Sequence, residues 1–541
     1  MTAEGATTSP PTHRAEYGRR AARGMLLLTS AAVFTKGSGF LANLVLGWLL
    51  SKDDFGVFAI AISLSSVATS IQDGGATRLI RHPDEFARLG RAVSRVSLAV
   101  NLLAATAVLV MAPIAASIYQ RPSLVWLLLI IGASLPLGNR PLMLKARLIA
   151  DLRFGTLSRI DTTSTIFRNI LAVTLAWAGF GAMSLALPTP IGLLLDWLLL
   201  HRAVGSGIPG EPLNRALFAE LFRSMRWIAL GLVAIAIAAN GPPTIIGLFQ
   251  PTAVVGVFFF GMQIALTPLM VFNAGLAQVL MPTLSRFRDD TRRQGLAFQR
   301  MLSVVSLASA PIAIGIVLLA PQLVQLLWHG RWNDAVPVIQ ATAATIPFRL
   351  VGPAGQAVME SRGRWGLRAS LLVADAVGTL VVAAVGARLG GAAVIAACLA
   401  CFRLVMSMVY GIGSGRLVGV GVVHILRCLV PPVLISGSVA LVASLSIGRA
   451  CAALSVLAQA AILAASYGVL VSGLLILFHP GRLRDAASVL GPVRAKTPAP
   501  QAERPADAGD ATGTPLAGTD ARAGTPQPDR PGADPGSGSS P

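Results

Sequence analysis

Residues 453–478 read ALSVLAQAAILAASYGVLVSGLLILF, a stretch of twenty-six residues that contains no charged side chain. An α-helix of about 20 apolar residues is long enough to cross the hydrocarbon core of a bilayer. The whole chain has this character, because 54% of its 541 residues are hydrophobic and only 13% are charged. Soluble domains carry roughly 25% charged residues. The stretch predicts a transmembrane helix, and the composition predicts an all-α polytopic membrane protein.

Working outward from this stretch, comparable apolar runs recur along the chain and predict about 14 transmembrane helices. Short polar loops separate them, and no soluble domain is inserted. The fourteen predicted segments are 25–50, 55–75, 92–117, 123–143, 162–180, 182–201, 227–249, 253–280, 302–325, 335–358, 368–387, 390–413, 424–447 and 453–478.

The distribution of Lys and Arg predicts how these helices are oriented. With the N-terminus placed in the cytoplasm, the cytoplasmic segments hold 34 basic residues and the outside loops hold 5. Cytoplasmic loops of membrane proteins carry such an excess of Lys and Arg. We therefore expect a multi-pass protein of the bacterial inner membrane with both termini cytoplasmic. The same excess accounts for the net charge of +20 without nucleic acid as a partner.

A weak internal repeat divides the predicted helices into two groups of six. Phe55-Gly56-Val57-Phe58 recurs as Val255-Gly256-Val257-Phe258, each time at the start of an even-numbered helix. Parallel repeats of this kind predict two six-helix lobes around a central cavity, with two extra helices. The predicted parts are a cytoplasmic segment 1–24, a lobe 25–201, a cytoplasmic linker 202–226, a lobe 227–413, two additional helices 414–480 and a disordered cytoplasmic tail 492–541.

The motifs of common enzyme classes are absent from the sequence. It contains no G-x-x-x-x-G-K-[ST] loop for ATP, no H-E-x-x-H zinc motif and no G-x-S-x-G nucleophile motif. The loops are also too short to form a nucleotide-sugar domain. We expect a protein that is not an enzyme and that has no catalytic residue, metal site or cofactor.

Ionisable residues inside predicted helices are the candidate functional residues, because a charge within the bilayer is costly and usually lines a cavity. Lys36 lies near the centre of the first predicted helix, and Arg349 lies near the middle of the tenth. Two buried cations favour an anionic cargo, and the planar fork of Arg suits phosphate. We predict that Lys36 and Arg349 bind substrate phosphate in the cavity.

Further polar residues are candidates for lining the cavity or for coupling transport to an ion gradient. Asp196 and Asp375 each lie near the cytoplasmic end of a predicted helix, where a partner cation or an interfacial position would explain them. Uncharged polar residues within helices more often join neighbouring helices by hydrogen bonds. The uncharged candidates are Asn43, Asn240, Gln263, Asn273 and Gln278.

Three segments resemble a family of exporters. They are Phe55-Gly56-Val57-Phe58-Ala59-Ile60-Ala61 with Asp73-Gly74-Gly75, Leu280-Met281-Pro282-Thr283-Leu284-Ser285-Arg286 with Asp289-Asp290, and Leu326-Leu327-Trp328-His329-Gly330-Arg331-Trp332. The chain thereby resembles the oligosaccharide flippases (Wzx-type polysaccharide transporters) of the multidrug/oligosaccharidyl-lipid/polysaccharide exporter superfamily over about residues 20–480.

The resemblance implies a function. It implies alternating access and the export of undecaprenyl-diphosphate-linked repeat units for exopolysaccharide, capsule or lipopolysaccharide. It also implies membrane lipids, a polymerase and chain-length or export proteins as partners, and antiport coupled to a proton or sodium gradient. A peptidoglycan lipid II flippase and a cation-coupled multidrug exporter are alternatives on the same scaffold. A surface-glycan polymerase or ligase and a non-transporting scaffold are alternatives of other classes.

Overall fold

The described residues form helices joined by short turns. In this computed structural model they are 34–81, 86–205, 207–211, 214, 218, 230–268, 290–450 and 454–478. Residues 1–490 form one compact unit, and Gly491–Pro541 form a separate unit in which no residue is described. Asn273, Gln278 and the predicted segments 1–24 and 492–541 lie outside the described residues.

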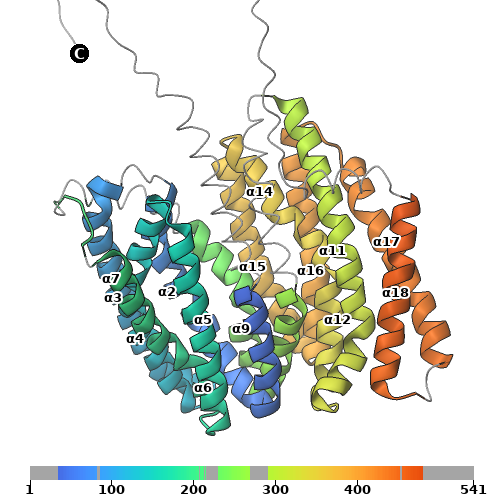
Figure 1. Cartoon of the computed structure of the whole chain (residues 1–541), viewed down its shortest axis with the longest axis horizontal. Helices are drawn as coiled ribbons and strands as arrows, with labels where there is room; N and C mark the ends of the chain where they lie inside the picture. Colours follow the sequence, from blue (N-terminus) through green and yellow to red (C-terminus); the bar gives the residue numbers. More distant parts are fainter. Residues whose placement is uncertain are drawn as a thin grey trace, which may run out of the picture. The chain divides into compact units, whose positions relative to one another are not determined.

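The first group of helices covers residues 34–204 and is called the N-terminal bundle here. After the helix of residues 34–49, it contains α2 (Lys52–Arg81), α3 (Phe86–Ile118), α4 (Ser123–Ala150), α5 (Phe154–Trp177), the short α6 (Met183–Ala186) and α7 (Pro188–Val204). Contacts of α4 with α2, α3, α5 and α7 hold this bundle together, as Figure 1 shows.

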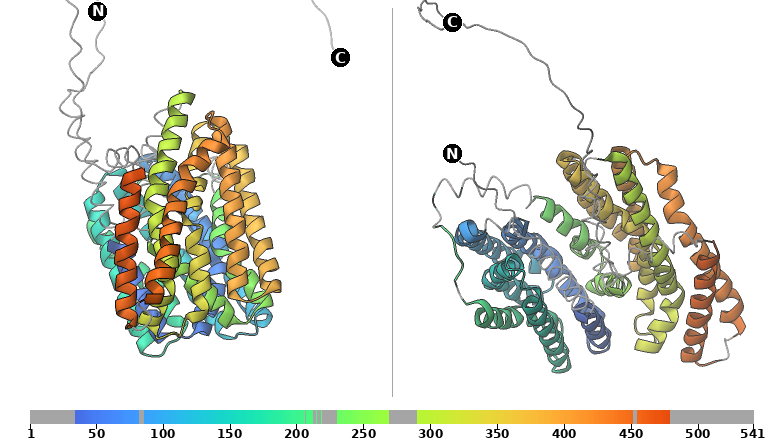
Figure 2. Two further views of the ribbon diagram at one scale, coloured as in Figure 1. Left: turned by 90° about the vertical axis from the view of Figure 1, so that its right-hand side faces the viewer. Right: turned by 45° about the horizontal axis from the view of Figure 1, so that its top comes forward.

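The second group covers residues 230–417 and is called the C-terminal bundle. Its elements are Leu230–Asn240, α9 (Pro242–Phe249), Thr252–Pro268, α11 (Thr291–Trp328), η2 (Asn333–Ala335), α12 (Val336–Ala344), α13 (Ile346–Arg349), α14 (Val351–Ser361), α15 (Trp365–Leu389) and α16 (Ala392–Leu417). Two further helices, α17 (Val422–Ala450) and α18 (Val456–Phe478), pack on α11, and both views in Figure 2 place them beside it.

Two spans of the C-terminal bundle are bent. Leu230–Asn240 and α9 meet at 46°, and the helices Asn333–Ala344 and Ile346–Ser361 meet at 42°. Proline explains both breaks: Pro242 and Pro243 begin α9, and Pro347 lies in the first turn of α13. Proline cannot donate the backbone hydrogen bond that would continue a straight helix. The second bend places Arg349 at the end of α13, inside the bundle.

The structure confirms the all-α polytopic class. Every one of the fourteen predicted segments contains a helix among the described residues. Within the described residues, eight helices are long and apolar enough to cross a membrane, or up to ten when each bent pair counts as one span. The number fourteen and the boundaries of the lobes therefore stay predictions.

The bundles meet where two small residues allow two helices to cross. A Cβ added at Gly56 would collide with the carbonyl oxygen of Thr252, and one added at Gly256 would collide with that of Lys52. Lys52 and Thr252 are the first residues of their helices and lie 200 positions apart, as Gly56 and Gly256 do. The repeated motif thus packs against its own copy at the ends of the helices that we call the Lys52 end.

Aromatic side chains fill the space beside this crossing. The rings of Phe260 and Trp332 stack with their centroids 3.9 Å apart, and Phe55 meets Trp332 edge to face at 5.5 Å. All three side chains are buried in one hydrophobic core that draws residues from both bundles. Aromatic pairs of this geometry add roughly 0.5–1.5 kcal/mol each to the burial of their surface.

Candidate functional site

A pocket of about 290 Å³ with charged side chains in its wall lies inside the C-terminal bundle. It is lined by Arg349 from α13, Asp375 from α15, and Arg403 and Tyr410 from α16, together with apolar residues of Leu230–Asn240. Arg349 and Arg403 also line a smaller adjoining pocket with the hydroxyls of Thr342, Thr345 and Thr379. Side chains from several helices of the bundle therefore converge on one space that contains three charged groups.

Asp375 neutralises one of the two arginines in this pocket. Arg403 Nη1 lies 2.5 Å from Asp375 Oδ1, and its Nη2 donates to the carbonyl oxygen of Ala238 at 2.5 Å. The two side chains are only 16% and 13% exposed. Arg349, by contrast, forms no ion pair with a residue that the structure describes. The pocket therefore carries the surplus positive charge that an anionic ligand would balance.

A second buried charge cluster lies within the N-terminal bundle. Asp196 on α7 is 1% exposed, and its Oδ2 lies 3.0 Å from Lys145 Nζ on α4 and 3.6 Å from Arg168 Nη1 on α5. Lys145 also binds Asp161 Oδ1 at 2.7 Å. Asp196 Oδ1 is buried and lacks a hydrogen-bond partner among the described residues. Two cations and two carboxylates thus balance each other across three helices.

The remaining predicted site residues are not gathered in the Arg349 pocket. Lys36 is exposed in the helix of residues 34–49, and its amino group forms no ion pair within the described part of the chain. Asn43, Asn240 and Gln263 are half-buried in three different helices. No contact between described residues joins Lys36 to Arg349, so their common role in binding stays a prediction.

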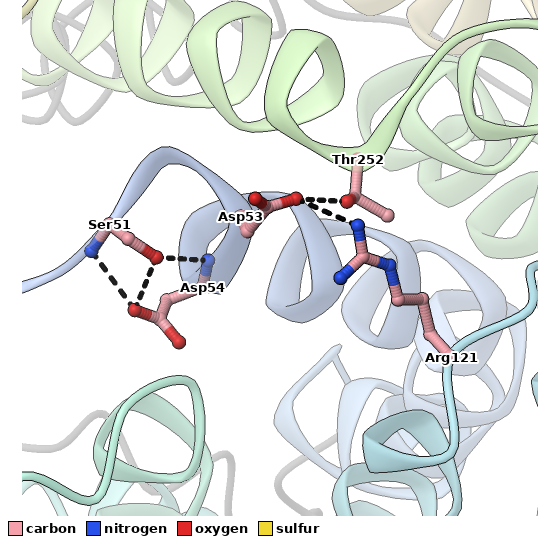
Figure 3. Close-up of polar contacts among 5 residues, drawn as sticks. All are labelled: Ser51, Asp53, Asp54, Arg121 and Thr252. Carbon is pink, nitrogen blue, oxygen red and sulfur yellow. Dashed lines mark hydrogen bonds and ion pairs between the residues drawn. The ribbon is translucent and has the colours of Figure 1, made fainter.

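At the Lys52 end, Asp53 accepts hydrogen bonds from both sides of the boundary between the bundles. Its Oδ1 receives the hydroxyl of Thr252 from the C-terminal bundle, and Arg121 Nη2 from the loop between α3 and α4 at 3.1 Å. Figure 3 shows both side chains directed at this one carboxylate. Lys52 Nζ lies 2.6 Å from Asp334 Oδ2 across the same boundary. We call these contacts of Lys52 and Asp53 the latch.

Asp54, next in the chain, works within its own bundle. Its Oδ2 accepts from Ser51 N and from Ser51 Oγ at 2.9 and 2.6 Å, while Ser51 Oγ accepts from Asp54 N at 3.1 Å, as Figure 3 shows. This reciprocal pair is a capping box, which satisfies backbone donors at the start of α2. It fixes the direction of the first turn, and so the position of Asp53.

The turn after α11 clamps the first helix from the other bundle. Trp328 Nε1, Arg331 Nη1 and Trp332 Nε1 donate to the carbonyl oxygens of residues 44, 48 and 47 at 3.1, 2.7 and 2.9 Å. His329 adopts a left-handed backbone conformation (φ 48°), and Gly330 follows at φ 80°, so the chain reverses between the two tryptophans. In the sequence alone, these residues indicate a resemblance to a family and give no sign of this contact.

Tyr119, just beyond α3, makes a further contact between the bundles. Its hydroxyl donates to the carbonyl oxygen of Thr244 at 2.8 Å, and burial raises its pKa to about 12. Ser63 accepts from Thr244 Oγ1 at 2.6 Å one layer deeper. The hydrogen bonds that we find between the bundles, within the described residues, all lie in the half nearest the Lys52 end.

Sequence reasoning missed the partners at this end. Asp53 and Lys52 were noticeable as charges in a short loop, but nothing in the sequence paired them with Arg121 or Asp334. The 200-residue offset was the one usable signal, because it aligns Asp53 with a position next to Thr252. Contacts between residues so far apart in the chain depend on how the bundles pack, which a sequence pattern does not specify.

Comparisons with known proteins agree with this architecture. A family profile described as "Polysaccharide biosynthesis protein" matches residues 45–337. The lipopolysaccharide biosynthesis protein WzxC of Escherichia coli (strain K12) is 22% identical over 61% of this chain and 68% of its own. The succinoglycan biosynthesis transport protein ExoT of Rhizobium meliloti (strain 1021) is 24% identical over 56% of this chain and 62% of its own.

A solved structure shares the fold at low sequence identity. The inward closed conformation of the lipid II flippase MurJ superposes with a TM-score of 0.65, covering 83% of this chain and 99% of that one at 12% identity. Similarity at this identity concerns the arrangement of the helices alone.

Proposed function

Because the chain belongs to the polysaccharide biosynthesis protein family, we propose that it is a flippase that moves undecaprenyl-diphosphate-linked oligosaccharides across the inner membrane. The names of WzxC and ExoT support polysaccharide biosynthesis and transport as the setting. The single structural observation that carries the proposal is Arg349, a cation without a carboxylate partner among the described residues, in a pocket inside a membrane bundle. The protein acts as a transporter and not as an enzyme.

The orientation in this proposal follows the distribution of basic residues. The Lys52 end faces the outside, both termini are cytoplasmic, and the bundles are held together at the outer face. Alternating access then requires the latch to break and the cytoplasmic halves of the bundles to approach each other. The lipid tail stays in the bilayer while the sugars pass between the bundles.

Arg349 binds the diphosphate in this mechanism, and Lys36 on the first helix adds a second positive charge. A diphosphate cannot cross hydrocarbon without such partners, because burying an unpaired charge costs far more than a few kcal/mol. Asn43, Asn240, Gln263, Asn273 and Gln278 are proposed as polar contacts along the path. Their side chains suit sugar hydroxyls, for which amides are both donors and acceptors.

Coupling to a proton or sodium gradient is proposed for Asp196 and Asp375. Each is held by arginine or lysine in this state, at 3.0 Å and 2.5 Å respectively. An acidic side chain contributes to coupling when a conformational change separates it from its cation and exposes it to a proton or sodium ion. Antiport follows if that exposure alternates with substrate binding.

The test is flipping in vesicles that contain the purified chain and a labelled undecaprenyl-diphosphate oligosaccharide. We expect Arg349→Ala and Lys36→Ala to reduce flipping at least tenfold, and Arg364→Ala, an exposed arginine outside the pocket, to leave it unchanged. Normal polymer export in cells carrying both substitutions would exclude this mechanism.

The same vesicles separate the alternatives. Flipping of peptidoglycan lipid II in place of the oligosaccharide would identify a lipid II flippase. Expulsion of cationic drugs with no lipid movement would identify a multidrug exporter. If the folded protein moves neither lipid-linked oligosaccharide, nor lipid II, nor drugs, a scaffold role remains, in a complex with the polymerase and the chain-length proteins.

A further inference from the structure

Three arginines surround a second pocket, far along the chain from Arg349. The pocket has a volume of about 450 Å³ and lies between α3 and α4, with residues 207 and 208 as its third wall. Arg91 and Arg95 contribute from successive turns of α3, and Arg140 contributes from α4. The backbone N–H of Arg91 donates to the carbonyl oxygen of Pro209 at 2.9 Å, which holds the wall in place.

Neighbouring arginines at this end of the bundle have carboxylate partners, but these three do not. Arg88 lies 3.6 Å from Glu211, and Arg147 lies 3.7 Å from Asp151. Within the described residues, Arg91, Arg95 and Arg140 form no ion pair, and no Asp or Glu lines their pocket. Arg91, Arg95 and Arg140 are exposed at this face, and they differ from the other basic residues there because all three line one cavity.

A buried amide in the same pocket also lacks a partner. Asn139 is 2% exposed, and its Nδ2 donates to the carbonyl oxygen of Ser94 at 3.2 Å, whereas its Oδ1 accepts from no described residue. Leaving a buried acceptor unpaired is destabilising, because the oxygen has lost its hydrogen bonds to water. A bound hydroxyl would satisfy it, so the pocket offers one acceptor beside three cations.

Above the arginines, both helices turn apolar faces outward. Leu98 and Leu102 continue the line of Arg91 and Arg95 on α3 and are 38% and 50% exposed, and Leu137 on α4 is 41% exposed. Spacings of three and four residues place such side chains on one helix face. A basic pocket below an exposed apolar stripe matches an amphiphile with an anionic head, and basic pockets between transmembrane helices bind lipid headgroups.

We propose that the pocket between α3 and α4 binds a lipid headgroup that carries two phosphate groups. Three guanidinium groups exceed the single charge of an ordinary phosphodiester and are better balanced by two phosphates. Arginine also pairs with phosphate through two parallel hydrogen bonds. The site lies at the cytoplasmic face in the orientation of the proposed function, and that orientation is the only part of the proposed function on which it rests.

The experiment measures lipid binding to the purified full chain by native mass spectrometry, without transport. The probes are cardiolipin, phosphatidylglycerol, phosphatidylethanolamine and a polyprenyl diphosphate, each added in mixed micelles. We expect a two-phosphate probe to bind more tightly than phosphatidylglycerol and phosphatidylethanolamine. Each charged hydrogen bond is worth about a factor of ten. The variant Arg91→Gln/Arg95→Gln/Arg140→Gln should therefore lose at least tenfold in affinity for that probe.

The matched control is Arg202→Gln/Arg292→Gln/Arg416→Gln, which removes the same charge from exposed positions outside the pocket. Equal losses in the two triple variants, or normal binding by the pocket variant, would overturn the proposal. Preference for cardiolipin identifies a bilayer lipid as the ligand, and preference for the polyprenyl diphosphate identifies a waiting site for a lipid diphosphate. The Arg349→Ala variant should bind the two-phosphate probe normally. Lipid binding at this pocket can therefore be judged even if the flipping test fails.

Discussion

At the scale of single residues, the latch is held by weak contacts. Asp53 reaches the other bundle through the hydroxyl of Thr252. Its side chain and that of Arg121, its partner within the same bundle, are 50% and 42% exposed, and exposed ion pairs contribute roughly 0–1 kcal/mol. Lys52 and Asp334 are 29% and 70% exposed. Such contacts orient the two bundles without locking them, which suits a closure that must open in each transport cycle.

We therefore expect Asp53→Asn to shift the balance between closed and open states by less than about fivefold. The measurement is maleimide labelling of a single cysteine at Val57, which is 4% exposed, in a chain without its four native cysteines. Asp54→Asn is the matched control, because Asp54 accepts only from its own bundle. Complete labelling of the Asp53→Asn variant would show that the latch stabilises the closed state by more free energy than exposed contacts contribute.

The buried pair of Asp375 and Arg403 should behave differently. Removing one partner of a buried pair costs about 3–5 kcal/mol, because the remaining charge is left unpaired. Arg403→Gln should lower the unfolding free energy by about 3 kcal/mol in a denaturant titration, and Arg403→Gln/Asp375→Asn should recover most of it. Arg364→Gln, at an exposed position, should change it by less than about 0.5 kcal/mol. No recovery in the double variant would contradict the pairing.

The sequence marked the charged residues as candidates, a role that stays a prediction, and it did not specify their partners. Asp196 and Asp375 were expected either to meet a cation or to lie at an interface, and both meet cations. The partners Lys145 and Arg403 are 51 and 28 residues away. Their proximity depends on which helices are neighbours in the bundle, and hydrophobic periodicity carries no information on that.

At the scale of helices, the crossing of α2 with Thr252–Pro268 is a contact that depends closely on the identity of two residues, Gly56 and Gly256. A single methyl group at Gly56 or Gly256 meets backbone on the other helix, which has no side chain that can turn away. Overpacking of this kind costs about 1–3 kcal/mol. The crossing therefore tolerates no side chain larger than hydrogen at these two positions.

Gly56→Ala should open the Lys52 end, since the added Cβ fits only when the helices separate. We expect the Val57 cysteine to label at least fivefold faster in this variant. Gly437→Ala in α17 is the matched control, because its Cβ would meet no atom within 4 Å. Equal labelling rates in the two variants would mean that the helices already separate freely.

The short repeat was enough to predict which helices correspond, although not how they touch. From the sequence, Gly56 and Gly256 are members of a repeated motif. Only the structure shows that each glycine packs against the backbone of the helix that carries the other one. The bends at Pro242 and Pro347 were partly predictable, because proline interrupts a helix. Their angles, 46° and 42°, depend on packing.

At the scale of the whole molecule, transport requires the bundles to move relative to each other. A cleavable thiol cross-linker between Lys52→Cys and Asp334→Cys should stop flipping in vesicles, and cleavage of the linker should restore it. The same linker between Arg147→Cys in α4 and Asp151→Cys directly after it should have no effect. Undiminished flipping with the bundles cross-linked would exclude alternating access.

Hydropathy was sufficient to predict the fold class, because the bilayer restricts the chain to helices of a set length. The orientation that the loop charges indicate stays a prediction. The pairing of bundles was not predictable to the same degree. It depends on single contacts such as Trp332 with the backbone of residue 47. Neither tryptophan spacing nor composition indicates the helix that such a residue will meet.

Each bundle neutralises its own buried acid. Both partners of Asp196 lie within residues 145–168, and Arg403 shares a bundle with Asp375. During synthesis, the first bundle can bury its charges before any residue beyond α7 has left the ribosome. The neutralisation of Asp196 thus does not depend on the second half of the chain. Two genes encoding residues 1–226 and 227–541 should therefore yield halves that assemble in one membrane.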